Sequence, residues 1–326
     1  MNLKSKKYKC AIIGIGHWGK NYIRVLNEIG NIEIKYLCDK NPKLFKKYIK
    51  KYNCTENLQT VLDDSDIDFV VISTIASSHF NILKSFISNG IDVLIEKPVA
   101  ISRREVSYLK KIKSDSIIFT GFTFIYNPAI IKVKKLIDEN VIGDIYYINF
   151  FRTHLGLIRN DVSVVWDLAP HDISILMYLL DHKKPDRVKL NESNPLRSDK
   201  SDYAYLSLDF GKIKSLIHVS WIDCSKERKA IIVGSRGKII FDDINNFEKI
   251  KIIKKGVSSS VSEDSYGEFQ LNLRNGGITS PKISPKEPLK EMCKEFIKCI
   301  NIRKQPYTDL NFGIKVSEVI LNAKKN

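Results

Sequence analysis

One glycine pattern near the amino terminus limits the fold more than any other feature of this chain. Gly14, Gly16 and Gly19 end a short apolar strand, residues 9–16, and open a stretch whose apolar positions recur at helical spacing up to Ile29. A second apolar strand follows at 32–38. A strand, a helix and a strand within about thirty residues form a βαβ unit, which requires a parallel sheet.

The same alternation continues to residue 121. Further buried strands are predicted at 68–73, 92–95 and 116–121, and they alternate with predicted helices at 42–52, 79–89 and 103–113. The fold class is therefore α/β, with an amino-terminal doubly wound Rossmann domain over residues 1–124.

The rhythm changes near residue 127, where a second domain is expected. Helices are predicted at 129–140 and 170–180, a long strand at 145–154, and strands with period-two alternation at 203–210, 213–223, 228–233 and 238–241. A Ser-, Gly- and Pro-rich stretch, 258–285, is expected to be a long loop before closing helices at 288–303 and 312–325. We predict an α+β domain over 125–326 with a mostly antiparallel open sheet, which binds substrate and forms a homodimer or homotetramer.

The formal charge of +16 raises the question of a nucleic-acid partner. Only 11 of the 53 basic residues are arginine, and the lysines are spread along the whole chain in short clusters. This distribution favours a solvated basic surface over a nucleic-acid site. A basic surface also attracts small molecules that carry phosphate.

The sequence does not indicate a membrane-spanning protein or a metal-binding protein. No apolar run approaches the ~20 residues of a membrane span. The six cysteines form no CxxC pair or metal-like cluster, so we expect buried, reduced thiols, a cytoplasmic location and no metal site.

The glycine pattern predicts a dinucleotide site. Gly14 permits the tight turn, Gly16 lets the backbone approach a pyrophosphate, and Gly19 allows close helix–strand packing, with His17 and Trp18 between them at the helix start. Asp39 ends the second strand, where a carboxylate accepts hydrogen bonds from the ribose hydroxyls and repels a 2′-phosphate. We therefore expect NAD, with NADP as the alternative that Lys40 leaves open; the non-functional interpretation is an ordinary tight turn.

Two further segments follow predicted strands and should line the cofactor crevice. Thr74 comes after the strand 68–73, and His79 is expected to pack or cap the next helix more than to perform chemistry. Glu96, Lys97 and Pro98 end another strand, where the proline should aim the preceding side chains outward. Lys97 is then placed to orient a substrate hydroxyl or act as a base, although a surface lysine paired with Glu96 is an equal alternative.

Asp167 and His171 lie four residues apart and share one face of a predicted helix. A carboxylate in that position fixes the imidazole tautomer and raises its basicity, as removal of a hydroxyl proton requires. The alternatives are a capping role for Asp167 and a core role for His171, and for Asp172 capping is favoured.

Arginine is rare in this chain, so Arg152 and Arg159 near the predicted site suggest diphosphate binding. Surface ion pairs are the alternative. Tyr126 and Asn127 lie at the predicted domain junction, where substrate binding and packing are equally favoured.

Together these motifs resemble the Gfo/Idh/MocA family of glucose–fructose oxidoreductase-like and inositol dehydrogenase-like proteins over the whole chain. The resemblance rests on Gly14-x-Gly16-x-x-Gly19, Thr74…His79, Glu96-Lys97-Pro98, Asp167-x-Ala169-x-His171-Asp172 and Glu287-Pro288-Leu289. The family usually has glycine at Ala169 and proline at Ile75, two mild departures. The resemblance implies that Lys97, Asp167 and His171 line the sugar site.

A narrower pattern is similar to bacterial and archaeal UDP-N-acetylglucosamine 3-dehydrogenases. It comprises Gly19-Lys20-Asn21 together with Arg152…Gly156…Arg159…Val165-Trp166…Ala169-Pro170-His171-Asp172. The resemblance implies oxidation of the sugar 3-hydroxyl to a ketone, for later amination in amino-sugar and lipopolysaccharide synthesis. The alternatives are a keto-sugar reductase or inositol dehydrogenase, an NAD-dependent glycosidase, and a non-catalytic NAD-binding regulator.

Overall fold

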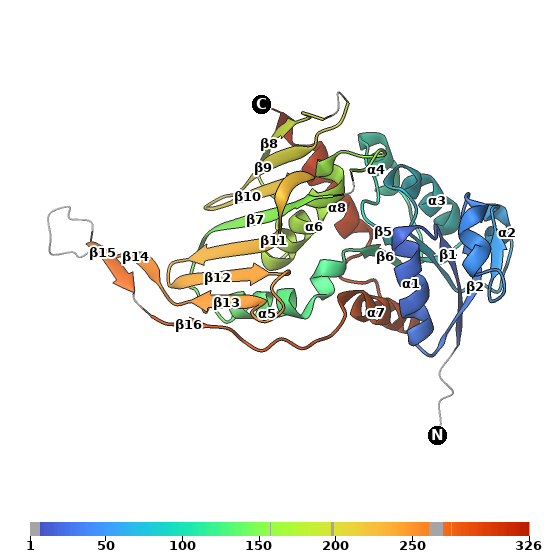
Figure 1. The fold of residues 1–326 in the computed structure, drawn as a ribbon, viewed down its shortest axis with the longest axis horizontal. Coiled ribbons are helices and arrows are strands. Elements are labelled where there is room, and N and C mark those ends of the chain that lie inside the picture. The colour runs from blue at the N-terminus through green and yellow to red at the C-terminus, as the bar shows by residue number, and fades with distance from the viewer. Residues whose placement is uncertain (1–6, 157, 197–198, 261–269, 275, 326) are drawn as a thin grey trace, which may run out of the picture. The chain divides into compact units, whose positions relative to one another are not determined.

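The chain divides into two compact units, which are drawn as ribbons in Figure 1. The computed structural model describes residues 7–156, 158–196, 199–260, 270–274 and 276–325. One unit comprises Met1–Tyr126 and Lys286–Leu321, and the other comprises Asn127–Pro285 and Asn322–Asn326.

This division differs from the predicted continuous second domain, 125–326, because the two closing helices belong to the first unit. Helix α7 (Pro288–Ile302) places Phe296 edge-on to Phe69 and Phe119, with ring centroids 5.2 and 5.6 Å apart. Burial of this aromatic cluster ties α7 to the first sheet. The role of the second unit in substrate binding and oligomerisation stays a prediction.

The first unit is built on a six-stranded parallel sheet, as the alternation predicts. Its central strands are nearly continuous apolar runs, as expected for a sheet that is covered on both faces. In spatial order the strands are β3 (Asn53–Thr55), β2 (Ile32–Cys38), β1 (Tyr8–Ile13), β4 (Phe69–Ile72), β5 (Asp92–Glu96) and β6 (Ile118–Gly121).

Two apolar cores flank this sheet, and helices close each of them. Besides α7, the helical segments of the first unit are α1 (His17–Glu28), η1 (Pro42–Lys47), α2 (Leu58–Leu62), α3 (Ala76–Ser88), α4 (Arg103–Leu109), η2 (Thr123–Tyr126) and α8 (Leu310–Leu321). The helix predicted over 42–52 is only a short 3₁₀ turn, begun by the Asn41 cap and Pro42, and β3 and α2 carry no clear periodicity in the sequence.

The second unit contains a nine-stranded mixed sheet, mostly antiparallel as predicted. β10 pairs with β7 in parallel, and β17 pairs with β8 in parallel. In spatial order the strands are β16 (Ile278–Thr279), β13 (Ile250–Ile253), β12 (Gly237–Asp242), β11 (Ile222–Gly234), β7 (Ile145–Leu155), β10 (Ile213–Ser220), β9 (Tyr203–Phe210), β8 (Arg187–Ser193) and β17 (Lys324–Lys325).

Helices α5 (Pro128–Asp138) and α6 (Val164–Leu179) pack against this sheet. Along β7 the residues at 148, 150 and 152 are buried, whereas on the alternate face 147 is exposed and 149 and 151 are half-buried, so one face of the sheet is covered and the other is more open. The prediction of a long loop over 258–285 is partly wrong. A hairpin of β14 (Gly256–Ser260) and β15 (Gln270–Arg274) overlaps this stretch, and β16 also lies in it. Residues 261–269, within that predicted loop, lie outside the described part.

Among the described helices, none has both the length and the apolar character needed to cross a bilayer. Likewise, the described residues bring together no group of three or more His, Cys, Asp or Glu side chains suited to a metal ion.

Candidate functional site

The glycine turn between β1 and α1 is fixed by backbone contacts that exclude side chains. Gly14 has a φ of +88°, and a Cβ there would lie 2.7 Å from the backbone nitrogen of Thr74. A Cβ on Gly19 would lie 2.1 Å from the carbonyl oxygen of Gly14. Both glycines are therefore required by the protein's own packing.

Gly16 differs from its two neighbours. A Cβ built on it would meet no protein atom within 4 Å, so packing within the chain does not require glycine there. Gly16 also precedes α1, and no side chain caps the first turn of that helix. Backbone N–H groups at an uncapped helix start, beside an open backbone, fit a pyrophosphate. Exposed His17 and half-buried Trp18 lie in this first turn, with ring centroids 6.1 Å apart.

Asp39 lies at the carboxyl end of β2, as predicted. Its Oδ2 accepts a hydrogen bond from the backbone N–H of Ile15 at 2.8 Å, and its Oδ1 accepts one from the N–H of Asn41 at 2.9 Å. The carboxylate is thereby held against the glycine turn. Because each carboxylate oxygen can accept a second hydrogen bond, the group also suits a ribose diol.

His79 is buried inside the first unit, with a fractional exposure of 1%. Its Nδ1 lies 2.8 Å from the carbonyl oxygen of Pro98, and its Nε2 lies 3.0 Å from that of Thr74. The ring thus connects the turn that follows β4 with the turn that carries Lys97. This arrangement favours a positioning role over direct contact with the cofactor, the role that lining the predicted crevice implied.

Glu96 and Lys97 are buried, with exposures of 5% and 8%, so the expectation that the proline aims both outward is wrong. Glu96 accepts a hydrogen bond from the Tyr22 hydroxyl at 2.7 Å, which links the end of β5 to α1. Burial, and then the Glu96 charge, raise the pKa of Tyr22 well above its usual value. Burial of Lys97 also excludes the alternative of a solvated surface lysine.

In the second unit α6 begins at Val164, six residues before the predicted start at Pro170. Proline inside a helix removes one hydrogen bond and is costly, which is why the sequence suggested a start there. Most residues of α6 are buried, and this packing outweighs the local cost. The longer helix confirms that Asp167 and His171 occupy the same helix one turn apart.

The Asp167 carboxylate is held by two side chains. The indole Nε1 of Trp221 donates to Oδ2 at 3.3 Å, and Nη1 of Arg159 contacts Oδ1 at 3.3 Å. Trp221 was not predicted, because it follows β10 in sequence and only the fold brings it to α6. His171 is half-buried, and its hydrogen bond to Asp167 stays a prediction.

Arg152 and Asp172 form a buried pair, which changes both of their predicted roles. The guanidinium contacts the Asp172 carboxylate at 2.7, 3.0 and 3.1 Å, and the two side chains are 6% and 3% exposed. Asp172 lies in the interior of α6 and does not cap it, so the capping prediction is wrong. Arg152 is engaged in the core and is poorly placed to meet a diphosphate.

Arg159 is also engaged by carboxylates. Its guanidinium contacts Asp161 at 3.0 Å through both Nε and Nη2, in addition to Asp167. Burial opposes the charge, but the hydrogen bonds and charges of Asp161 and Asp167 raise the pKa of the guanidinium. Arg159 therefore positions Asp167 as well as contributing charge.

Tyr126 and Asn127 both have packing roles in their own units. The Tyr126 hydroxyl lies 3.1 Å from Oγ1 of Thr308, and its ring packs on Phe119. Asn127 is 5% exposed and caps α5 by accepting from the N–H of Ala129 at 2.9 Å. These contacts favour the packing alternative for both residues.

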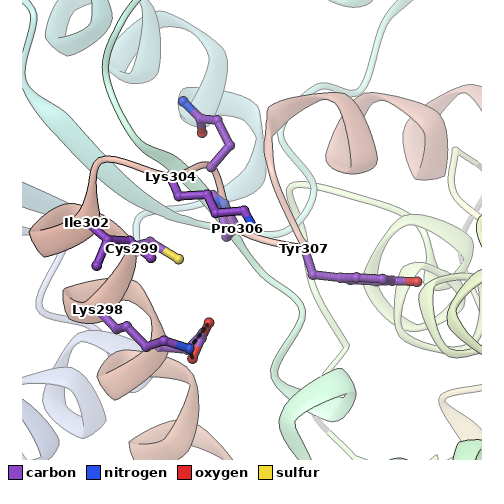
Figure 2. Close-up of a pocket in the computed structure, with 8 residues that line it drawn as sticks. Lys298, Cys299, Ile302, Lys304, Pro306 and Tyr307 are labelled. Atoms are coloured by element: carbon purple, nitrogen blue, oxygen red, sulfur yellow. Dashed lines mark hydrogen bonds and ion pairs between the residues drawn. The ribbon is translucent and has the colours of Figure 1, made fainter.

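A hollow of about 370 Å³ lies at the end of α7, and Figure 2 shows the residues around it. The adjoining Gln305 bonds the backbone of Ser116 and Ile118 before and in β6, and Arg303 pairs with Asp92, the first residue of β5. The hollow therefore lies at the amino-terminal edge of the parallel sheet, opposite the glycine turn. Ligands of such sheets bind at the carboxyl edge, so we assign no role in the reaction to it.

Comparison with known proteins places this geometry in a family. Residues 8–116 match the model of an oxidoreductase family with an NAD-binding Rossmann fold, GFO_IDH_MocA, and residues 130–240 match the GFO/IDH/MocA carboxy-terminal domain.

Individual relatives are distant in sequence and close in fold. The NAD⁺-dependent scyllo-inositol 2-dehydrogenase of Bacillus subtilis is 24% identical over 280 residues, 80% of this chain and 81% of that protein. The structure of UDP-N-acetylglucosamine 3-dehydrogenase GnnA from Acidithiobacillus ferrooxidans has a TM-score of 0.78 at 19% identity, covering 97% and 96% of the two chains. A gentamicin A biosynthesis protein in complex with NAD has a TM-score of 0.79 at 16% identity, covering 98% and 93%.

Proposed function

Since this chain belongs to the Gfo/Idh/MocA family of NAD-binding oxidoreductases, we propose that it oxidises a secondary alcohol of a nucleotide-activated sugar. The specific target is the 3-hydroxyl of UDP-N-acetylglucosamine, which becomes a ketone. The Asp167 carboxylate, held by Trp221 and Arg159 one helical turn before half-buried His171, is the observation that carries this proposal.

Each of these residues has a part in the proposed reaction. His171 takes the proton of the substrate hydroxyl, and Asp167 orients the imidazole and stabilises the imidazolium. Lys97 positions the same hydroxyl oxygen from its buried place after β5. NAD, when bound, would supply the acceptor for the hydride. The residues that would hold it are Gly14, Gly16, Gly19 and Asp39, with His17, Trp18 and Thr74 beside them.

The choice of a nucleotide sugar rests on the residue pattern that includes Arg159, Asp167 and His171, and on the basic charge of the chain. Fold likeness to the UDP-N-acetylglucosamine 3-dehydrogenase does not choose the substrate, since inositol dehydrogenases share the fold. The likeness in sequence to scyllo-inositol 2-dehydrogenase makes inositol oxidation the second candidate.

Substrate specificity is tested by incubating the purified protein with NAD and UDP-N-acetylglucosamine, UDP-glucose, free sugars or myo-inositol. NADH absorbance reports turnover, and mass spectrometry after carbonyl trapping locates the ketone. A 3-keto product from the UDP-amino sugar alone supports the proposal, and product from inositol alone overturns it. Free sugar released without net NADH would identify an NAD-dependent glycosidase, and NAD binding without turnover would favour a regulator.

The catalytic assignment is tested separately. His171→Ala should lower kcat by about 10²- to 10⁴-fold, the usual contribution of a general base, and should leave the Kd for NAD unchanged. His218→Asn, on the open face of the sheet, is the matched control. Unchanged turnover in H171A excludes His171 as the base.

We also propose that the chain forms a homodimer or homotetramer through the open face of the second unit's sheet. Tyr147, Tyr205 and Leu216 project from that face with exposures of 42%, 39% and 37%. Apolar groups gathered on one exposed face favour association. Leu216→Glu should lower the mass measured by light scattering, whereas Ile302→Glu, at an exposed site of the first unit, should not.

A further inference from the structure

The end of β11 next to β7 departs from regular pairing. Ile222 pairs with Leu155, and the next pairs along the two strands are Glu227 with Thr153. Residues 223–226 therefore form a bulge opposite the single residue His154. The Thr153 hydroxyl donates to the carbonyl oxygen of Ser225 at 2.8 Å and holds this bulge in place. Bulges of this kind redirect side chains beside functional sites.

The bulge gathers cationic groups on the covered face of the sheet. Arg228 is the strand partner of Arg152, whose guanidinium reaches α6, so both arise on that face. His154 lies two residues beyond Arg152 and shares the same face. Its ring packs over Gly156, where a Cβ would lie 2.4 Å from Cδ2, so this glycine makes room for the imidazole.

The same cluster lies beside the Asp167 carboxylate. Burial lowers the pKa of His154, Asp167 opposes that change, and Arg228, Lys226 and Arg152 add to it. These charged groups therefore lie near enough to the ring to affect its titration. Its lowered pKa leaves the imidazole neutral near pH 7, with one N–H to donate.

The cations at the bulge form weaker ion pairs than Arg152 and Arg159, the two arginines that the sequence suggested for diphosphate binding. Arg228 is 43% exposed and meets Asp243 at a long 3.5 Å, and Lys249 approaches that same carboxylate at 3.9 Å. Over the described ranges Lys226 is exposed and has no ion-pair partner, and His154 makes no hydrogen bond through its ring. Arg152, in contrast, is neutralised in the core.

We propose that Lys226, Arg228 and His154 form a subsite that binds the diphosphate of the nucleotide sugar. This inference rests on the proposed function, since it assigns a binding site to the diphosphate of that substrate. An arginine fork and a lysine ammonium match the charge of two linked phosphates, and a neutral imidazole adds a hydrogen-bond donor. Arg159 is then left to position Asp167 beside the sugar.

The test compares two probes, UDP and uridine, by calorimetric titration of the NAD-loaded protein. Wild type should bind UDP at least about tenfold more tightly than uridine, because only UDP carries the diphosphate. Lys226→Gln and Arg228→Gln should each remove much of this preference, and the double variant should abolish it. Added salt should weaken UDP binding in wild type and change it little in the double variant.

The control is Lys229→Gln, the neighbouring lysine that pairs with Glu227 at 2.8 Å. K229Q should keep the full preference, and an unchanged melting temperature together with an unchanged Kd for NAD in every variant shows that the protein is folded. A double variant that retains the preference overturns the subsite and leaves the proposed function standing. Wild type that fails to bind UDP but oxidises a free polyol overturns both.

Discussion

The two units place their functional groups by different physical means. Around the glycine turn of the first unit the essential contacts are made by backbone atoms, and Gly14 and Gly19 are required because nearby backbone leaves no room for a Cβ. In the second unit the functional groups are charged side chains. Their availability depends on which partner each one meets, as Arg152 shows by its burial against Asp172. Close contacts between backbone atoms fix the first site, whereas the pairing of charged side chains fixes the second.

The largest expected effect on stability comes from breaking the buried pair of the second unit. Asp172→Asn leaves the Arg152 guanidinium buried without a countercharge, so the free energy of unfolding should fall by about 3–5 kcal/mol. The measurement is urea unfolding followed by intrinsic fluorescence. The double change Arg152→Met with Asp172→Leu should recover most of this loss, because neither charge then remains in the core. A loss below about 1 kcal/mol in D172N would argue against a tightly buried pair.

The next effect separates two glycines of the first unit. Gly19→Ala places a methyl group against the Gly14 carbonyl oxygen, which should cost about 1–3 kcal/mol of stability and abolish NAD binding. Gly16→Ala meets no protein atom, so the melting temperature should hold while the Kd for NAD rises at least about tenfold. Thermal unfolding and NAD titration measure the two quantities. If G16A loses stability as G19A does, the contrast between the glycines is wrong.

A third change asks whether His79 touches the cofactor or positions Lys97. His79→Ala removes the partner of the Thr74 and Pro98 carbonyl oxygens and should cost about 1–3 kcal/mol of stability. The ring contacts the backbone of the turn that carries Lys97. We therefore expect kcat to fall more than the affinity for NAD. His79→Asn, which keeps one donor, should restore part of kcat. A rise in the Kd for NAD with kcat intact would instead support the direct cofactor contact.

The smallest expected effect is a dependence of stability on pH that arises from two histidines of the second unit. Burial is the main cause that lowers the pKa of both His154 and His218 in the folded state. Each ring therefore binds a proton more readily in the unfolded chain, so stability is present above the unfolded pKa and declines as pH falls through the folded pKa. Melting temperatures should decrease modestly from pH 7.5 to 5.5, and His218→Gln should flatten this profile. An unchanged slope in H218Q would exclude His218 as a contributor.

Much of the fold could be predicted because its signals are local. Apolar runs and helical periodicity set the parallel sheet of the first unit, and period-two alternation set strands such as Tyr203–Phe210. Local signals also misled: Pro170 suggested a helix start, although burial of α6 carries the helix through it. The closing helices show no local sign of the unit they join, and the contact of Phe296 with Phe69 and Phe119 decides it.

Alone, the sequence determined the class of fold, the family, the cofactor turn and the Asp167–His171 spacing. These depend on residue type and on separations of a few positions along the chain, which a helix or strand converts directly into geometry. Three further features became visible in the folded chain alone: Arg152 is bound to Asp172, Trp221 supports Asp167, and Lys226 and Arg228 flank His154. Pairing between distant residues depends on strand register and on a bulge, neither of which can be read from separations along the chain.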